Sequence, residues 1–320
     1  MTQEEFPNNL DIKLIKQEDL RYGENPHQKS AFYKVEGLKP KFKKIAGDKQ
    51  LSYNNIIDIE SAWNCADEFK KPAVVIVKHT NPCGAALGED TIDAYRKAFA
   101  CDTRSAFGSI IACNKIVTSH FAQELKGLFV EALVAPSFTD SALKILKEKK
   151  KNCRIIEVDT SIRSNLNIIS TSDGFLFQTT DETEAQEEWS VATSTTPDDE
   201  QRRDLEFAWK IAKHCKSNAI VLAKNEVTIG IGVGQMSRID ALDIALTKAW
   251  VPYASNSKVY KSVMASDAFF PFPDCIEKAG CHNIVACIQP GGSIRDKDSI
   301  ETADKHNMAM IFTGHRHFRH

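Results

Sequence analysis

The sequence lacks a long apolar run. No window approaches the roughly 18 consecutive apolar residues that a membrane-spanning helix requires. The amino-terminal segment, residues 1–7, is acidic and has no apolar core, so it does not resemble a signal peptide. These absences predict a cytoplasmic protein without a membrane partner.

A strong charge of either sign is also missing. The 41 basic and 43 acidic side chains nearly cancel, which leaves a formal net charge of −2. Nucleic acids attract basic proteins, so we expect no nucleic-acid partner. The 320 residues suffice for two domains or one large one, and hydrophobic and charged contents of 42% and 26% are ordinary for a globular protein.

The nine cysteines show no pattern of pairs or metal ligands. They are odd in number and scattered singly, which is typical of free thiols in a reducing compartment. Nucleotide deaminases bind zinc with His-x-Glu and a distant Pro-Cys-x-x-Cys. Here Ala86 stands where the second cysteine would follow Cys83, and no His-x-Glu occurs anywhere. The sequence therefore predicts no zinc site and no bound metal.

Strands and helices alternate along the chain, which is the signature of an α/β fold. A polar stretch at 158–200 separates two halves that are built alike, and we expect two α/β/α domains at 1–168 and 169–320. Thr196-Pro197-Asp198-Asp199 is typical of a helix start with Thr196 as the N-cap. The other expected helices are 54–69, 91–100, 119–131 and 140–151, and the expected strands are 73–77, 218–223, 228–233, 284–288 and 308–312.

Lys78 and His79 directly follow the apolar run Ala73–Val77. Such a run is typical of a strand buried on both faces of a parallel sheet. Open α/β sheets bind ligands at the carboxyl ends of their strands. The Asn-Pro and Cys-Gly pairs at 81–84 then predict a turn. Lys78 and His79 are suited to acid–base chemistry, or else they only cap a strand in solvent.

Cys83 has two interpretations. It is either a catalytic thiolate, which would make the protein a hydrolase, or a small buried residue in the turn.

The second half carries further candidate binding segments at strand ends. Gln289–Ser293 offers backbone amides to an anion or a flat polar ring, or is only a tight turn. In Ser266–Asp274, Phe269 could stack on a flat ligand whose ring N–H groups Asp274 accepts, although core packing is the default for such rings. The basic tail at 316–320 is either frayed or docked at the same sheet edge, where Arg316 would bind phosphate.

The glycines at 230, 232 and 234 do not form Gly-x-Gly-x-x-Gly, and closely approaching backbones explain them better than a dinucleotide site does.

Taken together, eight segments closely resemble the transformylase portion of a family of bifunctional purine-biosynthesis enzymes, in which AICAR transformylase is joined to IMP cyclohydrolase. The resemblance runs from about residue 6 to the last residue. The segments, in order, are Leu20–Gln28, Lys78–Gly84, Ser105–Gly108, Lys216–Ala219, Gly230–Arg238, Ser266–Phe272, Gln289–Ser293 and Arg316–His320.

The resemblance implies formyl transfer from 10-formyltetrahydrofolate to the 5-amino group of AICAR, which gives FAICAR and tetrahydrofolate. His79 matches the family's proton acceptor and Lys78 its transition-state stabiliser. The family's AICAR contacts fall on Arg21, Tyr22, His79, Gly108, Glu131, Asn218, Arg238, Phe269 and Arg316. Its folate contacts fall on Ile239, Asp274, Ser293 and Ile294.

The resemblance also implies two cytidine-deaminase-like three-layer α/β/α units in tandem, and a homodimer with active sites at the interface. The family's cyclohydrolase domain precedes Arg21, and here twenty residues do. We therefore expect no ring closure by this chain, which leaves open whether a separate IMP cyclohydrolase is a partner that performs that step.

Two departures from the family pattern affect these expectations. Pro273 stands where relatives often have arginine, which puts a contact to the folate tail there in doubt. Some relatives bind potassium near Asp267, and Cys215 replaces a hydroxyl residue of that site, which leaves the ion open. A zinc-free nucleotide- or folate-binding module without catalysis is the alternative function, although a binding module has no need of Lys78 and His79.

Overall fold

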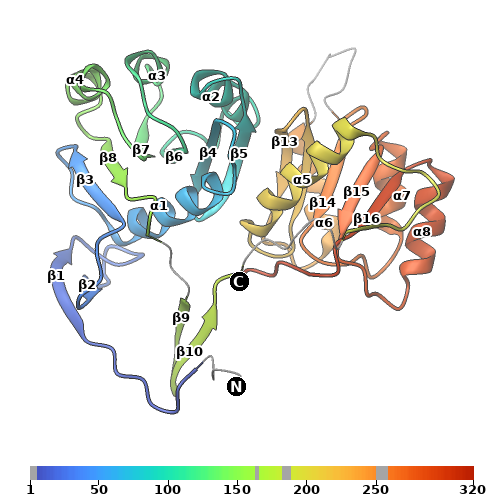
Figure 1. Cartoon of the computed structure of the whole chain (residues 1–320), viewed down its shortest axis with the longest axis horizontal. Coiled ribbons are helices and arrows are strands. Elements are labelled where there is room, and N and C mark those ends of the chain that lie inside the picture. The colour runs from blue at the N-terminus through green and yellow to red at the C-terminus, as the bar shows by residue number, and fades with distance from the viewer. Residues whose placement is uncertain (1–5, 163–165, 182–188, 250–258) are drawn as a thin grey trace.

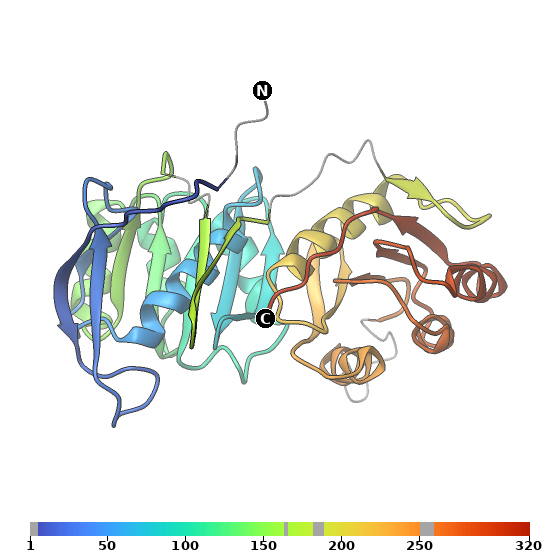
Figure 2. The same ribbon diagram turned by 90° about the horizontal axis from the view of Figure 1, so that it is seen from below.

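One long mixed sheet with helices on both faces organises the chain (Figures 1 and 2). The computed structural model describes residues 6–162, 166–181, 189–249 and 259–320. The twelve strands lie in the order β11-β16-β15-β14-β12-β13-β5-β4-β6-β7-β8-β3. The α/β class expected from the sequence is therefore confirmed. No helix in the described ranges is long and apolar enough to cross a membrane.

The order of elements in the first half of the sheet recurs in the second half. The first unit consists of α1 (Tyr53–Ala66), β4 (Ala73–Lys78), β5 (Asn81–Leu87), α2 (Thr91–Phe99), β6 (Ser109–Cys113), α3 (Ser119–Glu124), β7 (Val130–Ala135), α4 (Asp140–Lys149) and β8 (Arg154–Val158). The second unit consists of α5 (Asp199–Lys213), β12 (Ile220–Lys224), β13 (Val227–Gly232), α6 (Arg238–Ala249), β14 (Val263–Ser266), α7 (Asp274–Cys281), β15 (Ala286–Gln289), α8 (Asp296–Lys305) and β16 (Ala309–Phe312).

Strand pairing repeats in the same way. In each unit an antiparallel hairpin leads into a third antiparallel strand, and the last two strands continue in parallel. The two units are thus built alike, as the sequence suggested. Their assignment as cytidine-deaminase-like domains stays a prediction.

Three apolar clusters form the layers. Under α1 and α5 a single cluster runs along one face of the sheet through both units and includes the fully buried Trp63 and Trp209. On the other face, α2–α4 cover the first unit and α6–α8 cover the second, each over a cluster of its own. Each unit therefore contributes three layers.

Glycines allow the hairpins to lie close to the covering helices. A Cβ atom at Gly84 would lie 2.1 Å from the carbonyl oxygen of Ala98 in α2, and one at Gly230 would lie 2.1 Å from that of Ala245 in α6. The close backbone approach expected for the glycines around 230 is confirmed.

The two units meet through β5 and β13. Their ladder consists of the single pair Val227↔Ala86, and the Leu87 N–H donates to the Glu226 carbonyl oxygen at 2.9 Å. Thr228 Oγ1 accepts from the Ala85 N–H at 2.8 Å. All of these contacts lie at the end of the two strands that is remote from Lys78 and His79. We call this junction the seam.

Six strands lie outside the repeat. β3 (Phe42–Ala46) and β11 (Ser190–Val191) form the two edges of the main sheet, while β1 (Leu14–Leu20) pairs with β2 (Ser30–Val35) and β9 (Leu166–Thr171) with β10 (Gly174–Thr179). The domain boundary expected at residue 168 lies within β9 and stays a prediction.

Three local expectations were wrong. β4 is buried on both faces but pairs antiparallel with both β5 and β6, so it is not part of a parallel ladder. The helix expected at 119–131 ends at Glu124, because Gly127 adopts a φ of 85° and β7 begins at Val130. Helix α5 begins two residues later than expected, because Asp198 caps it by accepting from the Gln201 N–H.

Candidate active site

Lys78 and His79 lie where β4 turns into β5. The two turn residues are His79 and Thr80, with φ values of 54° and 64°, so the turn precedes the 81–84 segment in which we expected it. Pro82 and Cys83 instead belong to strand β5. Lys78 Nζ donates to the Phe107 carbonyl oxygen at 2.8 Å, and His79 is exposed. The imidazole therefore faces solvent at the edge of the sheet.

Two side chains of helix α1 hold this turn in place through hydrogen bonds. Asp58 Oδ1 accepts from the Thr80 N–H at 2.6 Å, and Ser61 Oγ donates to the Thr80 carbonyl oxygen at 2.7 Å. Burial raises the pKa of Asp58, and the Thr80 hydrogen bond and the nearby His79 oppose that rise only in part. The two contacts fix a left-handed backbone conformation that neither His79 nor Thr80 favours by itself.

The hairpin of the second unit provides an internal comparison. Its turn residues, Asn225 and Glu226, have φ values of 54° and 55°, and their N–H groups donate to Asp204 of α5 at 2.9 and 2.6 Å. Lys224 Nζ donates to the Tyr260 carbonyl oxygen at 2.8 Å, as Lys78 does to Phe107. The lysine and the shape of the turn are thus properties of the repeated fold. The histidine is present in the first unit alone.

Gly108 and Glu131, two of the expected AICAR contacts, lie at the same edge as Lys78. Ser109 at the start of β6 pairs with Val130 at the start of β7, which places both residues at the strand ends beside the β4–β5 turn. The Gly108 N–H donates to the Phe129 carbonyl oxygen at 2.8 Å. Glu131 forms an ion pair with Arg154, whose side chain is 8% exposed.

Arg238 lies at the centre of a buried network in the second unit. Its guanidinium donates to Asn218 Oδ1 at 2.7 Å and Ser266 Oγ at 2.9 Å, and it forms an ion pair with Asp267. The network joins the start of β12, the start of α6 and the end of β14. Two of the expected AICAR contacts, Asn218 and Arg238, are therefore in direct contact.

Asn81 connects the two halves of the candidate site. Its Oδ1 accepts from the Lys216 N–H at 2.9 Å, and its Nδ2 donates to the His79 carbonyl oxygen at 3.0 Å. The turn at His79 and Thr80 is thereby tied to the segment just before Asn218. Asn81 lies within the Lys78–Gly84 segment, but no pattern in the sequence marks it as this connection.

The basic tail is docked, which settles one alternative left by the sequence. The His317 N–H donates to the Asp267 carbonyl oxygen at 2.9 Å, and the Ser217 N–H donates to that of Arg319 at 2.9 Å. Arg319 also donates to the His214 carbonyl oxygen at 2.6 Å and to Ser61 Oγ at 3.2 Å. Sequence reasoning missed Arg319. Arg316 is exposed and lies 4.4 Å over the Phe318 ring.

The expected folate residues gather at the strand ends of the second unit. Ile239 is in the first turn of α6, and Asp274 is the first residue of α7, just after β14 and the half-buried Phe269. Ser293 and the fully exposed Ile294 follow β15. Because β14, β15 and β16 are parallel, their carboxyl ends lie side by side at one edge.

Arg21 and Tyr22 are the two expected contacts that lie elsewhere. They follow β1 on the separate β1–β2 sheet, with the Arg21 guanidinium 5.4 Å from the Tyr22 ring centroid. Among the described residues, no hydrogen bond or ion pair joins either of them to Lys78, His79 or Arg238. Within one chain, therefore, they do not complete the site.

Asp267 retains one unused oxygen. The residue is fully buried, and its Oδ2 atom has no hydrogen-bond partner in the described part of the chain. A buried carboxylate oxygen without a donor is a fit for a cation such as potassium.

Cys83 does not have the environment of a nucleophile. Burial raises its pKa to about 12, and its Sγ donates to the Ile76 carbonyl oxygen at 3.4 Å. A thiol with such a pKa carries almost no thiolate near neutral pH. The hydrolase alternative loses its support.

This geometry, a lysine–histidine turn beside the strand ends of a repeated α/β unit, agrees with the comparisons with known proteins. The family model described as "AICARFT/IMPCHase bienzyme" matches residues 1–248. The chain belongs to this family.

Individual relatives agree with the family match. The bifunctional purine biosynthesis protein PurH of Bacillus cereus (strain AH187) is 45% identical over 323 residues, which cover 99% of this chain and 62% of that protein. The PurH proteins of Bacillus anthracis (strain A0248) and Bacillus thuringiensis subsp. konkukian (strain 97-27) are also 45% identical, with the same coverage. The chain thus spans about 62% of the length of these curated relatives.

Proposed function

We propose that the chain transfers a formyl group from 10-formyltetrahydrofolate to the 5-amino group of AICAR, in purine biosynthesis. The observation that carries the proposal is the exposed His79 on a turn fixed by Asp58 and tied by Asn81 to the Asn218 segment. Family membership supports the reaction class, and the relatives are bifunctional purine biosynthesis proteins.

His79 is suited to accept the proton of the attacking amine. That amine is conjugated with the neighbouring carboxamide and is a poor nucleophile, so removal of its proton during attack matters. A bond forms between the amine nitrogen and the formyl carbon, the bond from that carbon to folate N10 breaks, and the proton lost by the amine is returned to N10. FAICAR and tetrahydrofolate are the products.

Lys78 is suited to stabilise the negative charge that develops on the formyl oxygen. Its ammonium group has three donors, and one of them is used by the Phe107 carbonyl oxygen. That bond fixes the direction of the group and leaves two donors for the substrate.

AICAR binding would involve the Asn218–Arg238 network and the exposed Arg316, with Phe269 available for the flat base. Ile239, Asp274, Ser293 and Ile294 are the proposed folate contacts. We also propose that Asp267 Oδ2 contacts a potassium ion, for which its unpartnered buried oxygen is the support.

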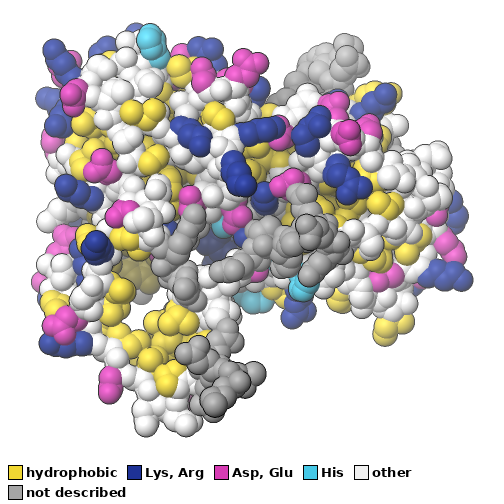
Figure 3. All heavy atoms as spheres, in the orientation of Figure 1, with side chains coloured by type: hydrophobic (Ala, Val, Ile, Leu, Met, Phe, Trp, Pro, Cys, Tyr) yellow, Lys and Arg dark blue, Asp and Glu magenta, His cyan; other side chains and the backbone are white. Residues whose placement is uncertain are grey.

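A second copy of the chain is the proposed partner. Arg21 and Tyr22 lie away from His79 within one chain, which is consistent with a site that two chains complete. The two-stranded sheets beside them expose many apolar side chains: Leu14, Ile15, Tyr33, Val35, Leu166, Ile168, Ile169, Phe175 and Leu176. Hydrophobic side chains gather in the lower left part of the face in Figure 3, over β1, β2, β9 and β10. Exposed apolar patches of this kind mark interaction surfaces.

The decisive test replaces His79 with the residue that the repeated hairpin carries at the same position. His79→Asn preserves a side chain that tolerates a positive φ, so the turn should persist. With AICAR and 10-formyltetrahydrofolate, we expect kcat to fall about 10²–10⁴-fold, as for a lost general base, while AICAR binding changes much less. The assay follows the absorbance of tetrahydrofolate.

Asn225→His is the matched control and should leave turnover unchanged. Near wild-type turnover of His79→Asn would remove His79 from the role of base, and wild-type protein without formyl transfer would remove the proposed reaction.

A further inference from the structure

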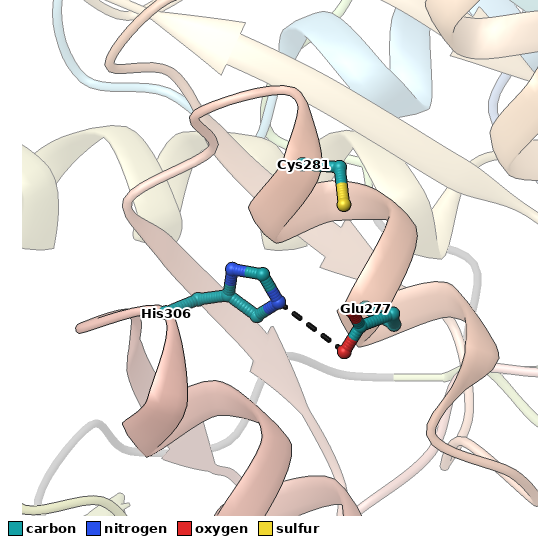
Figure 4. A group of neighbouring side chains, drawn as sticks. All are labelled: Glu277, Cys281 and His306. Atoms are coloured by element: carbon teal, nitrogen blue, oxygen red, sulfur yellow. Dashed lines mark ion pairs between the residues drawn. The ribbon is translucent and has the colours of Figure 1, made fainter.

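Three side chains that commonly bind metals meet between α7 and α8. Glu277 and Cys281 lie one turn apart on α7, and His306 caps the carboxyl end of α8. The ligand atoms of the three residues all lie within 4.8 Å of one another, and Figure 4 shows the His306 ring and the Glu277 carboxylate turned toward each other below Cys281. Among the described residues this is the one such group.

The backbone is shaped to receive the imidazole. A Cβ atom at Gly280 would lie 2.3 Å from His306 Cγ and 2.5 Å from its Nδ1, so any larger residue would displace the ring. His306 is also held from its own side, because its N–H donates to the carbonyl oxygens of Thr302 at 3.3 Å and Ala303 at 3.1 Å. The ring is therefore packed against α7 in a fixed position, with its Nε2 atom 3.2 Å from a Glu277 oxygen.

The donor set is one sulfur, one ring nitrogen and one carboxylate oxygen. Zinc accepts this mixture, with bonds of about 2.0–2.3 Å, so tetrahedral ligand atoms lie roughly 3.3–3.7 Å apart. The His306–Glu277 distance of 3.2 Å is already close to this range. The remaining approach is within reach of side-chain rotation, because Glu277 and Cys281 are exposed.

We propose that Glu277, Cys281 and His306 bind a zinc ion, with water in the fourth position. The site is separate from the deaminase-type zinc site that the sequence excludes around Cys83. It lies at the far end of α7 from Asp274, about 10 Å along the helix axis. The ion enters from solvent and ties α7 to α8.

A plain ion pair between His306 and Glu277 is the competing interpretation. It accounts for the 3.2 Å distance, but it needs neither the Cys281 thiol nor a glycine at 280. The two interpretations differ in whether a metal binds and in whether Cys281 takes part.

The first experiment titrates the full chain with zinc against a chromophoric chelator, and with cobalt to follow thiolate-to-metal charge transfer. Cys281 is the one exposed cysteine of the nine, so the cobalt signal reports this thiolate. We expect one ion per chain, and at least about tenfold weaker binding in Cys281→Ser and in His306→Gln. The control His120→Gln removes an exposed histidine on α3 and should bind as the wild type does.

The second experiment uses Gly280→Ala, which retains all three ligands. The added methyl group displaces the His306 ring, so zinc binding should weaken by a similar factor while helicity without metal stays unchanged. Zinc should also raise the melting temperature of the wild type but not that of Cys281→Ser. Equal zinc affinity in the wild type, Cys281→Ser and His120→Gln would overturn the proposal, as would a Gly280→Ala variant that binds zinc as tightly as the wild type.

Discussion

His79 and Asn225 occupy equivalent positions in two hairpins that share their lysine, their turn and the aspartate beneath the turn. The difference between these two side chains therefore distinguishes what the proposed reaction requires from what the repeated hairpin requires. Lys78 alone would be weak evidence for catalysis, because Lys224 makes the same kind of bond to a backbone carbonyl oxygen. The interpretation of Lys78 and His79 as a mere strand cap is adequate for the lysine, and the catalytic role of the histidine stays a prediction.

The residues that sequence reasoning missed share one property. Asp58, Asn81 and Arg319 act through backbone groups that are remote in sequence, such as Thr80, Lys216 and His214. Motifs report local spacing, whereas these contacts depend on how α1, β5 and the tail pack together. The Lys78–Gly84 and Ser266–Asp274 segments were recognisable because their unusual residue types are contiguous.

Glu68 governs the acid stability of the contact between α1 and α5. Burial raises its pKa, but hydrogen bonds and charges from His214 and Lys213 outweigh burial and hold the pKa at about 2. Lys213 Nζ lies 2.5 Å and His214 Nε2 2.9 Å from Glu68 Oε1. The folded state therefore prefers the ionised carboxylate more strongly than the unfolded chain does.

We predict that this contribution is present above the ordinary glutamate pKa of 4.5 and is lost as pH falls from there to about 2. Glu68→Gln should lower the free energy of unfolding by about 3 kcal/mol at pH 5.5. Urea denaturation at pH 5.5 and pH 3 measures whether the difference from wild type shrinks in acid. Glu301→Gln breaks an exposed pair with Lys297 and serves as a control without measurable change. A Glu68→Gln difference that is equal at both pH values would contradict the assignment.

Elements were predicted better than their connections. The apolar run Ala73–Val77 correctly indicated a strand covered on both faces, but burial on two faces does not encode strand direction. The turn was misplaced because Asn-Pro is a strong local turn signal, whereas His79 and Thr80 turn only with Asp58 beneath them. The start of α5 shifted because Asp198, two residues after the expected cap Thr196, caps the helix by accepting from the Gln201 N–H.

Asp58 should act as a positioning residue for His79, and Asp204 is its matched control. Asp58→Ala and Asp204→Ala each remove a carboxylate that accepts from turn N–H groups, so each should destabilise the fold by about 1–3 kcal/mol. Only Asp58→Ala should lower kcat, by about 10–100-fold, because it misplaces the base. Denaturation gives the stabilities, and steady-state kinetics with a pH profile gives kcat and KM separately.

Asp204→Ala should retain the activity of the wild type per folded molecule. If both variants lost activity equally, turn geometry at His79 would not be the cause. A loss confined to KM in Asp58→Ala would place Asp58 in binding rather than in positioning of the base.

At the scale of the whole molecule, the β4–β5 turn of the first unit and the carboxyl ends of β14, β15 and β16 in the second unit lie on the same side of the sheet. They do so because β5 and β13 are antiparallel. The sequence indicated two similar units but gave no means of placing one against the other. The seam depends on contacts such as Thr228 with Ala85, which are 143 residues apart.

Subunit mixing tests whether two chains complete each site. Arg21→Ala and His79→Asn should each be nearly inactive, the first through lost phosphate contacts and the second through a lost base. In a mixture, half the dimers are heterodimers with one intact site each, so activity should return to up to about a quarter of wild type. Activity is measured after full subunit exchange, with each parent alone as the control. A mixture as inactive as its parents would place Arg21 and His79 in the same chain's site.

The seam also bears on aggregation, which exposed edge strands of β-sheets promote. If the units were separate molecules, β5 and β13 would each end a sheet with bare N–H and C=O groups. Such edges recruit strands from other molecules and promote aggregation. By pairing the two edges at Val227 and Ala86 inside a single chain, the repeat covers one end of each, and the outer margins of the sheet are left to the short strands β3 and β11. Joining the two units in one chain thus gives these edges a partial protection against aggregation that neither unit would have by itself.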